Sequence, residues 1–331
     1  MGHGTHVSGI IGAARNGRGT MGVAYDATIM SMRAIGVAKE GKYSTNLGLM
    51  YAARNGASVI NGSYGPPPLP KKYIQRPDGT LLPNRNYVEF PSQLVVLPTL
   101  GSQYEAVKTA ARNDVVMVFA AGNEYGDQPQ GAAQPSGIAL FPAIRPENHR
   151  QGIYSFLLDL KDPNDSRTYK FADMNDPDLD EVDMSDLSGT LIAVVATDRQ
   201  GRIASYSNRC GIAALWCLAA PGGDLPIKGQ TKEEALVQST LPNSTYGGMA
   251  GTSMAAPVVS GGAAVLRGAF PYMTARQIIE VILTTAIPTD APEIYGRGRF
   301  NLGRAVKRPY EFGAVGYAQR FDVDTKGRNS T

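Results

Sequence analysis

The chain has 331 residues, of which 43% are hydrophobic and 18% charged, a composition that excludes disordered and coiled-coil proteins. Lysine and arginine outnumber aspartate and glutamate by only 32 to 29, so a nucleic acid is not expected as a partner. The sequence contains no run of about 18 or more apolar residues and therefore predicts no transmembrane helix.

Helical and strand-like segments alternate along the chain. The expected elements, in order, are a helix over 7–14, a strand over 27–32, a helix over 45–55, a strand over 57–61, a helix over 102–113, strands over 115–121 and 191–197, and helices over 252–269 and 274–286. Short apolar strands alternating with helices are typical of a parallel sheet. The sequence therefore predicts an α/β fold, with a doubly wound, mostly parallel sheet and helices on both faces.

Two long segments interrupt this alternation. Residues 65–100 contain eight prolines and no sustained period, which predicts a surface loop or extended arm. Residues 124–189 end in an acidic stretch, 159–186, with 10 acidic and 3 basic residues. Its string 175–180 offers oxygen ligands for a structural calcium ion, but it lacks the glycine and spacing of an EF-hand loop, and a solvated acidic loop is the alternative. No other metal and no cofactor is expected.

The string Gly-His-Gly-Thr-His-Val-Ser-Gly at residues 2–9 opens the first predicted helix and holds two of the three histidines. A lone histidine is usually structural. Flanking glycines, however, let the backbone approach a neighbouring strand and leave one face of an imidazole open. His3 is therefore a candidate general base.

Two further strings carry chemistry. Asn123, in Ala-Ala-Gly-Asn-Glu, follows a predicted buried strand, where its amide donors could meet an oxyanion, although Gly-Asn is also a common turn. Ser253, in Gly-Thr-Ser-Met-Ala-Ala-Pro, opens a long helix whose dipole favours negative charge nearby, and ordinary N-capping is the alternative. Pro257 is expected near the first turn, where a missing N–H costs least.

These strings, in this order, resemble the subtilisin-like serine proteases, the subtilases, from Gly2 to about Val306. The resemblance implies that His3 is the general base, Ser253 the nucleophile and Asn123 the side-chain oxyanion donor, with His6 a structural neighbour. It also implies that two segments flank the substrate as edge strands and bind an extended peptide through the backbone. These are Ser63, Tyr64 and Gly65 on one side and Ala120, Ala121 and Gly122 on the other. Proteins or peptides are the expected substrates.

The family's Asp-Ser/Thr-Gly string, which precedes the histidine on a central core strand, has no counterpart before His3. Asp26 and Asp114 do not stand in its position. We therefore expect an incomplete N-terminus that lacks the catalytic Asp and one core strand. Domain boundaries are expected at 1–308 for the catalytic domain and 309–331 for a linker or the start of a following passenger segment.

The cysteines at 210 and 217 permit either a small-loop disulfide or two buried free thiols. Their surroundings, and the segment 312–324, resemble bacterial autotransporter subtilases, which implies a disulfide and a secreted or cell-surface location as an outer-membrane autotransporter passenger. The function expected is a serine endopeptidase. The alternatives are an inactive binding or adhesive module of the same fold, and an esterase that uses the same serine and histidine.

Overall fold

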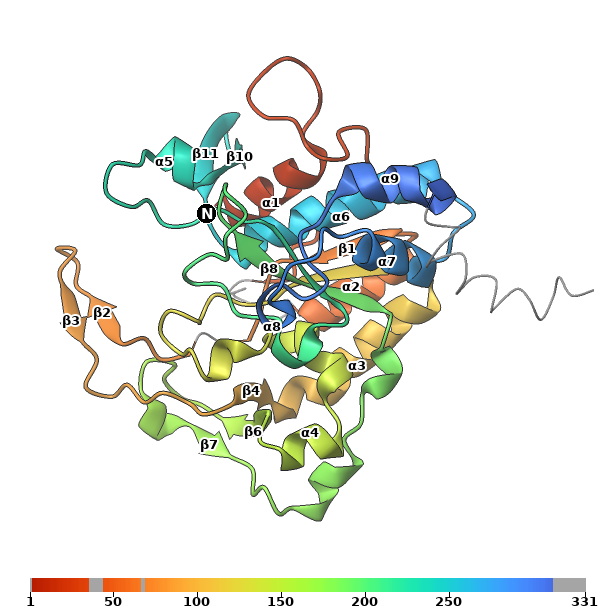
Figure 1. Ribbon diagram of the computed structural model, residues 1–331. Coiled ribbons are helices and arrows are strands. Elements are labelled where there is room, and N and C mark those ends of the chain that lie inside the picture. Colours follow the sequence, from red (N-terminus) through yellow and green to blue (C-terminus); the bar gives the residue numbers. More distant parts are fainter. Residues whose placement is uncertain (1, 36–43, 67–68, 312–331) are drawn as a thin grey trace, which may run out of the picture.

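The structure is a computed structural model that describes residues 2–35, 44–66 and 69–311. Within these residues, four parallel strands form the central sheet in the order β1-β5-β8-β9. Figure 1 labels β1 and β8 of this sheet. Their bounds are β1 Val59–Gly62, β5 Val116–Ala120, β8 Leu191–Thr197 and β9 Cys217–Pro221. The three strands predicted over 57–61, 115–121 and 191–197 are confirmed, and β9 has no counterpart among the predicted elements.

Helices cover both faces of this sheet. They are α2 Thr45–Arg54 and α3 Leu97–Arg112 on one face, and α6 Thr252–Ala269 and α7 Ala275–Thr284 on the other. Side chains alternate between the faces along β5: Met117 and Phe119 pack with α2 and α3, whereas Val116 and Val118 pack with α6 and α7. The predicted doubly wound α/β class is confirmed.

The first helix, α1 (His3–Gly12), lies between α6 and an antiparallel hairpin made of β10 (Val237–Leu241) and β11 (Thr245–Met249) (Figure 1). Its Val7 and Ile10 pack against Met254 of α6. On the other side, a Cβ on Gly9 would collide with the hydroxyls of Ser239 and Thr240. This glycine is therefore needed for the close approach of helix and hairpin.

The strand predicted over 27–32 is wrong. The segment is irregular, and Ile29, Met30 and Met32 are 38%, 41% and 38% exposed. An apolar run becomes a strand only where a neighbouring strand accepts its backbone hydrogen bonds, and none of the described strands pairs with this segment. β1, meanwhile, forms an outer edge of the described central sheet.

The two insertions build a second, smaller sheet together. It contains β4 (Gln93–Val96) from the first insertion and β6 (Tyr154–Asp159) and β7 (Lys170–Phe171) from the second. A small apolar cluster of Leu69, Phe90, Leu94, Leu157 and Tyr169 joins the two insertions. The prediction of a loop over 65–100 is thus wrong at β4 and at the start of α3, which begins at Leu97.

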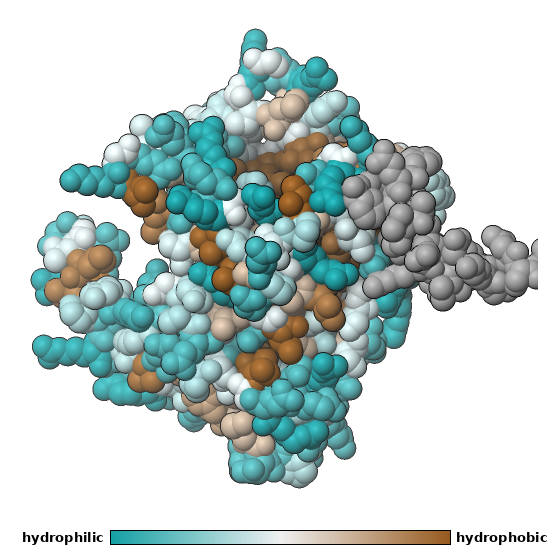
Figure 2. Space-filling view, in the orientation of Figure 1, coloured by the Kyte–Doolittle hydropathy of each residue, from teal (hydrophilic) through white to brown (hydrophobic). Residues whose placement is uncertain are grey.

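An arm-like part of the first insertion is confirmed. The hairpin of β2 (Tyr73–Gln75) and β3 (Leu81–Pro83) stands apart from the body and exposes apolar side chains (Figure 2).

The acidic stretch folds into short turns whose carboxylates mostly serve the backbone. Asp165 and Asp176 cap two short 3₁₀ helices, and Asp180 pairs with Arg150 at 2.9 Å. The calcium site stays a prediction. The remaining helices are α4 Pro146–Arg150, α5 Lys232–Ala235, α8 Pro292–Tyr295 and α9 Leu302–Glu311.

Cys210 and Cys217 form a disulfide with a Cα–Cα distance of 5.7 Å, and both are fully buried. The free-thiol alternative is therefore wrong. No helix among the described residues is long and apolar enough to cross a lipid bilayer. α9 continues past the expected domain boundary at residue 308, and residues 312–331 of the expected following segment lie outside the described residues.

Candidate active site

The carboxyl ends of β1 and β5 meet the amino-terminal turn of α6. Because β1 and β5 are parallel, the residues that follow them, Ser63 and Asn123, lie at the same edge of the sheet. Ser253 is the second residue of α6. Ser63 hydrogen-bonds to Ser253, and Asn123 hydrogen-bonds to the preceding Thr252. The structure thus brings together Ser253 and Asn123, which come from separate sequence strings.

The side-chain amide of Asn123 has a defined orientation. Its Oδ1 lies 2.8 Å from the backbone nitrogen of Thr252 and 3.0 Å from the Thr252 hydroxyl oxygen. Because a backbone N–H can only donate, the amide atom facing it must be the oxygen. Nδ2 of the exposed Asn123 is therefore a free donor, and no described residue accepts a hydrogen bond from it.

The backbone N–H of Ser253 is a second free donor. The first N–H groups of a helix lack partners within the helix. The N–H of Thr252 donates to Asn123, whereas the N–H of Ser253 has no acceptor in the described part of the chain. This N–H, the Asn123 amide and the positive end of the α6 dipole can stabilise negative charge beside Ser253. The arrangement fits the oxyanion role predicted for Asn123.

His3 is the first residue of α1, the helix that packs against α6. Within residues 2–35, 44–66 and 69–311, no hydrogen bond joins its imidazole to Ser253 or to a carboxylate. The Ser253 hydroxyl instead donates to the Ser63 carbonyl oxygen at 3.4 Å. Although His3 keeps exposed surface, partial burial lowers its pKa, because burial penalises the charged form.

His6 has a different environment from His3. It is fully buried, and its Nε2 lies 3.0 Å from the carbonyl oxygens of both Val237 and Gly247 on the hairpin. Burial lowers the pKa of His6 as well. These contacts tie α1 to the hairpin, which agrees with the structural role expected for His6.

The two segments predicted to flank a peptide differ in what their backbones can offer. Among the described residues, the backbone N–H and C=O groups of Tyr64 and Gly65 have no backbone partner, and Gly65 is exposed. By contrast, Ala121 donates to Val194, and its carbonyl accepts from Ser136. The Gly122 N–H and C=O are engaged as well, by Thr252 and Asn208.

This difference corrects one expectation. The strand end at Ala120, Ala121 and Gly122 cannot pair with a peptide as an edge strand, because β5 already lies between β1 and β8 and the groups that follow it are bonded. It can form a wall of a binding site. The free edge is the one at Tyr64 and Gly65.

A family comparison agrees with this geometry. The sequence model of the Subtilase family matches residues 1–313. The chain belongs to the Subtilase family.

Individual relatives point the same way. The chain is 31% identical to an extracellular serine protease of Serratia marcescens over 94% of its own length and 28% of that protein's length. It is 33% identical to serotype-specific antigen 1 of Mannheimia haemolytica over 63% of the chain and 17% of that protein. The chain therefore spans less than a third of the length of either relative. Among solved structures, the epidermin leader peptide processing protease EpiP of Staphylococcus aureus has a similar fold, with a TM-score of 0.59 and 20% identity over 94% of this chain and 64% of that one.

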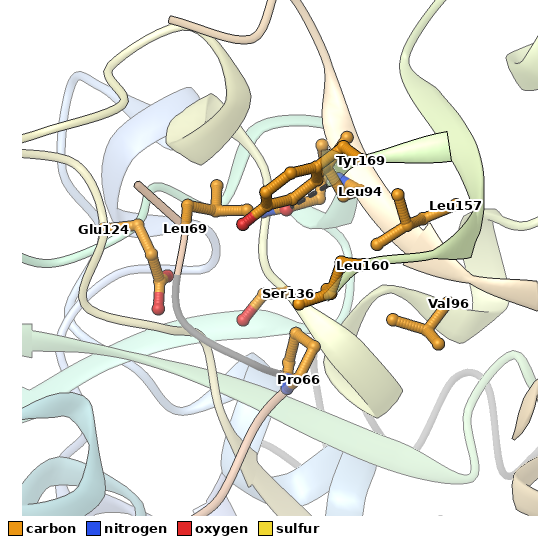
Figure 3. A pocket seen from close by; sticks show the side chains of 10 residues that line it. Pro66, Leu69, Leu94, Val96, Glu124, Ser136, Leu157, Leu160 and Tyr169 are labelled. Atoms are coloured by element: carbon orange, nitrogen blue, oxygen red, sulfur yellow. Dashed lines mark hydrogen bonds between the residues drawn. The ribbon is translucent and has the colours of Figure 1, made fainter. Parts of the chain in front are cut away.

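In this subtilase the residue after Asn123 is Glu124, whose carboxylate oxygen Oε2 is buried. Glu124 lines a small cavity of about 10 Å³ together with Pro66, Leu69 and Ser136, as Figure 3 shows. Burial raises the pKa of Glu124, and its Oε2 has no hydrogen-bond partner in the described part of the chain. A Cβ on Gly122, whose φ is +112°, would collide with this oxygen. In the sequence, only the position of Glu124 directly after Asn123 indicated that its side chain lies near this site.

A second, larger cavity of about 490 Å³ adjoins the free edge of the subtilase at Gly65. Its walls include Tyr64, Ile138 and Phe141. The Tyr64 hydroxyl is buried without a hydrogen-bond partner among the described residues, and burial raises its pKa. The cavity gives the edge at Tyr64 and Gly65 an adjacent space that could take a substrate side chain. Sequence reasoning did not find this cavity.

Asp114 cannot replace the family's Asp as a partner of His3. It precedes β5 and so lies at the amino-terminal ends of the parallel strands, whereas Ser63 and Asn123 lie at their carboxyl ends. There it accepts hydrogen bonds from the backbone of Ala275 at 2.6 Å and from Arg267 at 2.9 Å. Asp26 is exposed, and no hydrogen bond links it to His3 within the described residues.

Proposed function

We propose that this chain is the catalytic domain of an exported serine endopeptidase that cleaves peptide bonds through Ser253. The observation that carries the proposal is the pair of free donors beside the Ser253 hydroxyl, the Asn123 Nδ2 group and the Ser253 backbone N–H. Two such donors stabilise the oxyanion of a tetrahedral intermediate. The names of the relatives, an extracellular serine protease among them, support the same reaction.

The mechanism is acyl transfer. The Ser253 hydroxyl leaves the Ser63 carbonyl, gives its proton to the imidazole of His3, and attacks the peptide carbonyl carbon. The Asn123 amide and the Ser253 N–H hold the resulting oxyanion. His3 then protonates the leaving amine, and a water molecule releases the acyl group by the same steps in reverse order. The substrate lies as an extended strand along Tyr64 and Gly65.

His3 needs an orienting carboxylate, which none of the described residues supplies. We propose that an Asp on a further strand provides it, as the resemblance to subtilases implies. The outer edge of β1, which has no partner among the described strands, supports a further strand at this side of the sheet. The exposed apolar side chains of Ile29, Met30 and Met32 are consistent with a missing neighbour. Loss of this carboxylate from a catalytic triad costs about 10⁴-fold in rate. Activity should therefore fall by about this factor when that Asp is removed from the protein.

An exported, cell-surface location completes the proposal. The disulfide between Cys210 and Cys217 is typical of oxidising compartments. The relatives named extracellular serine protease and serotype-specific antigen support secretion or surface display. We propose that the chain is part of an autotransporter passenger. Trypsin treatment of intact cells tests this, since a surface passenger is digested while a cytoplasmic marker survives.

An inactive binding module is the second candidate, because the Ser253 hydroxyl bonds to Ser63 rather than to His3. A fluorophosphonate probe applied to the natural full-length protein separates the two. Labelling of wild type that is lost in Ser253→Ala supports the enzyme. A folded wild-type protein that takes no label supports the binding module. Turnover of esters but not of peptides would instead favour an esterase.

A further inference from the structure

The carbonyl of Ser253 lacks its ordinary partner within the helix. In an α-helix, the C=O of one residue accepts from the N–H four residues later. The residue four positions after Ser253 is Pro257, which has no N–H and lies in the second turn of α6 rather than in the first turn. The helix therefore leaves the carbonyl of the proposed nucleophile without the N–H donor that the residue four positions later ordinarily supplies.

Ser63 fills this place from outside the helix. Its Oγ donates to the carbonyl oxygen of Ser253 at 2.8 Å. The same residue accepts from the Ser253 hydroxyl through its own carbonyl at 3.4 Å. The residue that follows β1 thus contacts the nucleophile twice, once at the backbone and once at the reacting oxygen.

A chain of hydrogen bonds holds the Ser63 hydroxyl in this direction. Asn61 of β1 donates from Nδ2 to Ser63 Oγ at 2.8 Å, which leaves the hydroxyl proton of Ser63 for Ser253. The Oδ1 of Asn61 in turn lies 2.9 Å from the hydroxyl of Ser260, which also lies 3.1 Å from the carbonyl oxygen of Ala256. Ser260 lies on α6 two turns after Ser253 and is 1% exposed. The network therefore begins and ends on α6.

We propose that Ser63 is a positioning residue for the nucleophile, with a role beyond the backbone contact to peptide assigned to it from the sequence. Through its hydroxyl it replaces the donor that Pro257 removes, and it fixes the turn that carries the Ser253 hydroxyl and N–H. This role rests on the proposed function of Ser253. The Ser63 hydroxyl sets how often the nucleophile is aligned, whereas any contact to a peptide is made by the Ser63 backbone, which Ser63→Ala retains.

The test compares Ser63→Ala with wild type in the natural full-length protein. Loss of one hydrogen bond to a neutral group should lower kcat for a peptide, and the rate constant of fluorophosphonate labelling, by about three- to tenfold. The KM should change less than twofold. Ser63→Thr keeps the hydroxyl and should stay within about twofold of wild type in both rates.

Ser92→Ala is the matched control for general loss of a serine hydrogen bond. Ser92 is 5% exposed, and its hydroxyl bonds to Ser155 in the small sheet, away from Ser253. This variant should lower the unfolding temperature by about as much as Ser63→Ala and leave kcat unchanged. An equal fall of kcat in both variants would overturn the positioning role.

A double-mutant cycle tests the link to Pro257. Pro257→Ala restores an N–H that can donate to the Ser253 carbonyl, so Ser63→Ala should cost at most about twofold in that background. A cost that is the same in both backgrounds would overturn the argument from Pro257. If the wild type is labelled and Ser63→Ala is labelled at the same rate, the role of Ser63 is overturned while the proposed function stands. A wild-type protein that takes no label would overturn the proposed function together with this role.

Discussion

The surroundings of Ser253 and of His3 differ in how fully their polar groups are engaged. Around Ser253, the strand ends at Ser63 and Asn123 hold the first turn of α6 through hydrogen bonds of 2.8 Å. Around His3, none of the described residues makes a hydrogen bond to the imidazole, and the residue keeps exposed surface. The proposed nucleophile and oxyanion donors are thus held in place by residues of this chain, whereas the proposed base has no hydrogen-bond partner among the described residues.

Replacement of the two neighbouring histidines should give the largest contrast. His3→Ala should lower kcat by up to about 10⁶-fold, the loss that follows removal of a triad histidine, with little change in unfolding temperature. His6→Ala should instead lower the free energy of unfolding by about 2–5 kcal/mol, because the buried hydrogen bond to the hairpin is lost and a cavity is left. Peptide hydrolysis and thermal unfolding of both variants measure this. An unstable but catalytically normal His3→Ala would reverse the assignment.

Asn123→Asp should give the next largest effect. The carboxylate keeps an acceptor for the Thr252 N–H but removes the Nδ2 donor. We expect kcat to fall by about 10²- to 10³-fold while the unfolding temperature changes little. Asn123→Ala, which also removes the acceptor, should lose stability in addition. If Asn123→Asp kept full activity, the oxyanion assignment would fail.

Glu124→Gln should stabilise the protein in a pH-dependent way. Because burial raises the pKa of Glu124 in the folded state, the contribution of this group to stability is largest below pH 4.5 and is lost as the pH rises through the raised value. The glutamine variant avoids this loss. Its advantage should be near zero at pH 4 and reach about 1–3 kcal/mol at pH 8, the cost of a buried acceptor without a partner. Chemical denaturation at both pH values measures it, and Glu233→Gln, at an exposed glutamate, serves as the control for the change of charge alone.

The pH dependence of catalysis should show the smallest effect. Only neutral His3 can accept the proton of Ser253, and partial burial lowers its pKa. The acidic limb of kcat/KM should therefore have its midpoint below 6.5, the ordinary histidine value. Assays between pH 4 and 9 test this. A midpoint above 6.5 would instead indicate a carboxylate that stabilises the charged imidazole more strongly than burial destabilises it.

Sequence reasoning worked where one strong pattern decides the structure. The small-residue helix over 252–269 and the apolar strand over 191–197 have the bounds that their patterns predict. The meeting of Asn123 with the turn that carries Ser253 follows from two parallel strands that end at the same edge.

Sequence reasoning failed where the local structure depends on contacts with segments that are distant in the chain. The apolar run over 27–32 has a strand pattern but no described strand beside it. β4 is too short to show a period and exists because β6, from a distant segment, pairs with it. The direction of the Glu124 side chain and the compensation of Pro257 by Ser63 are contacts between elements, which local patterns do not encode.

The small sheet also bears on how such a domain can change by insertion and deletion. β4 comes from the first insertion, whereas β6 and β7 come from the second, and β6 lies between the other two. Removal of the first insertion alone would strip one side of β6 of its hydrogen bonds and expose Leu157 and Tyr169. Removal of the second alone would leave β4 unpaired. The two segments, far apart in the gene, are therefore expected to be inherited or lost as a unit, and shortened versions of this protease should lack both or neither.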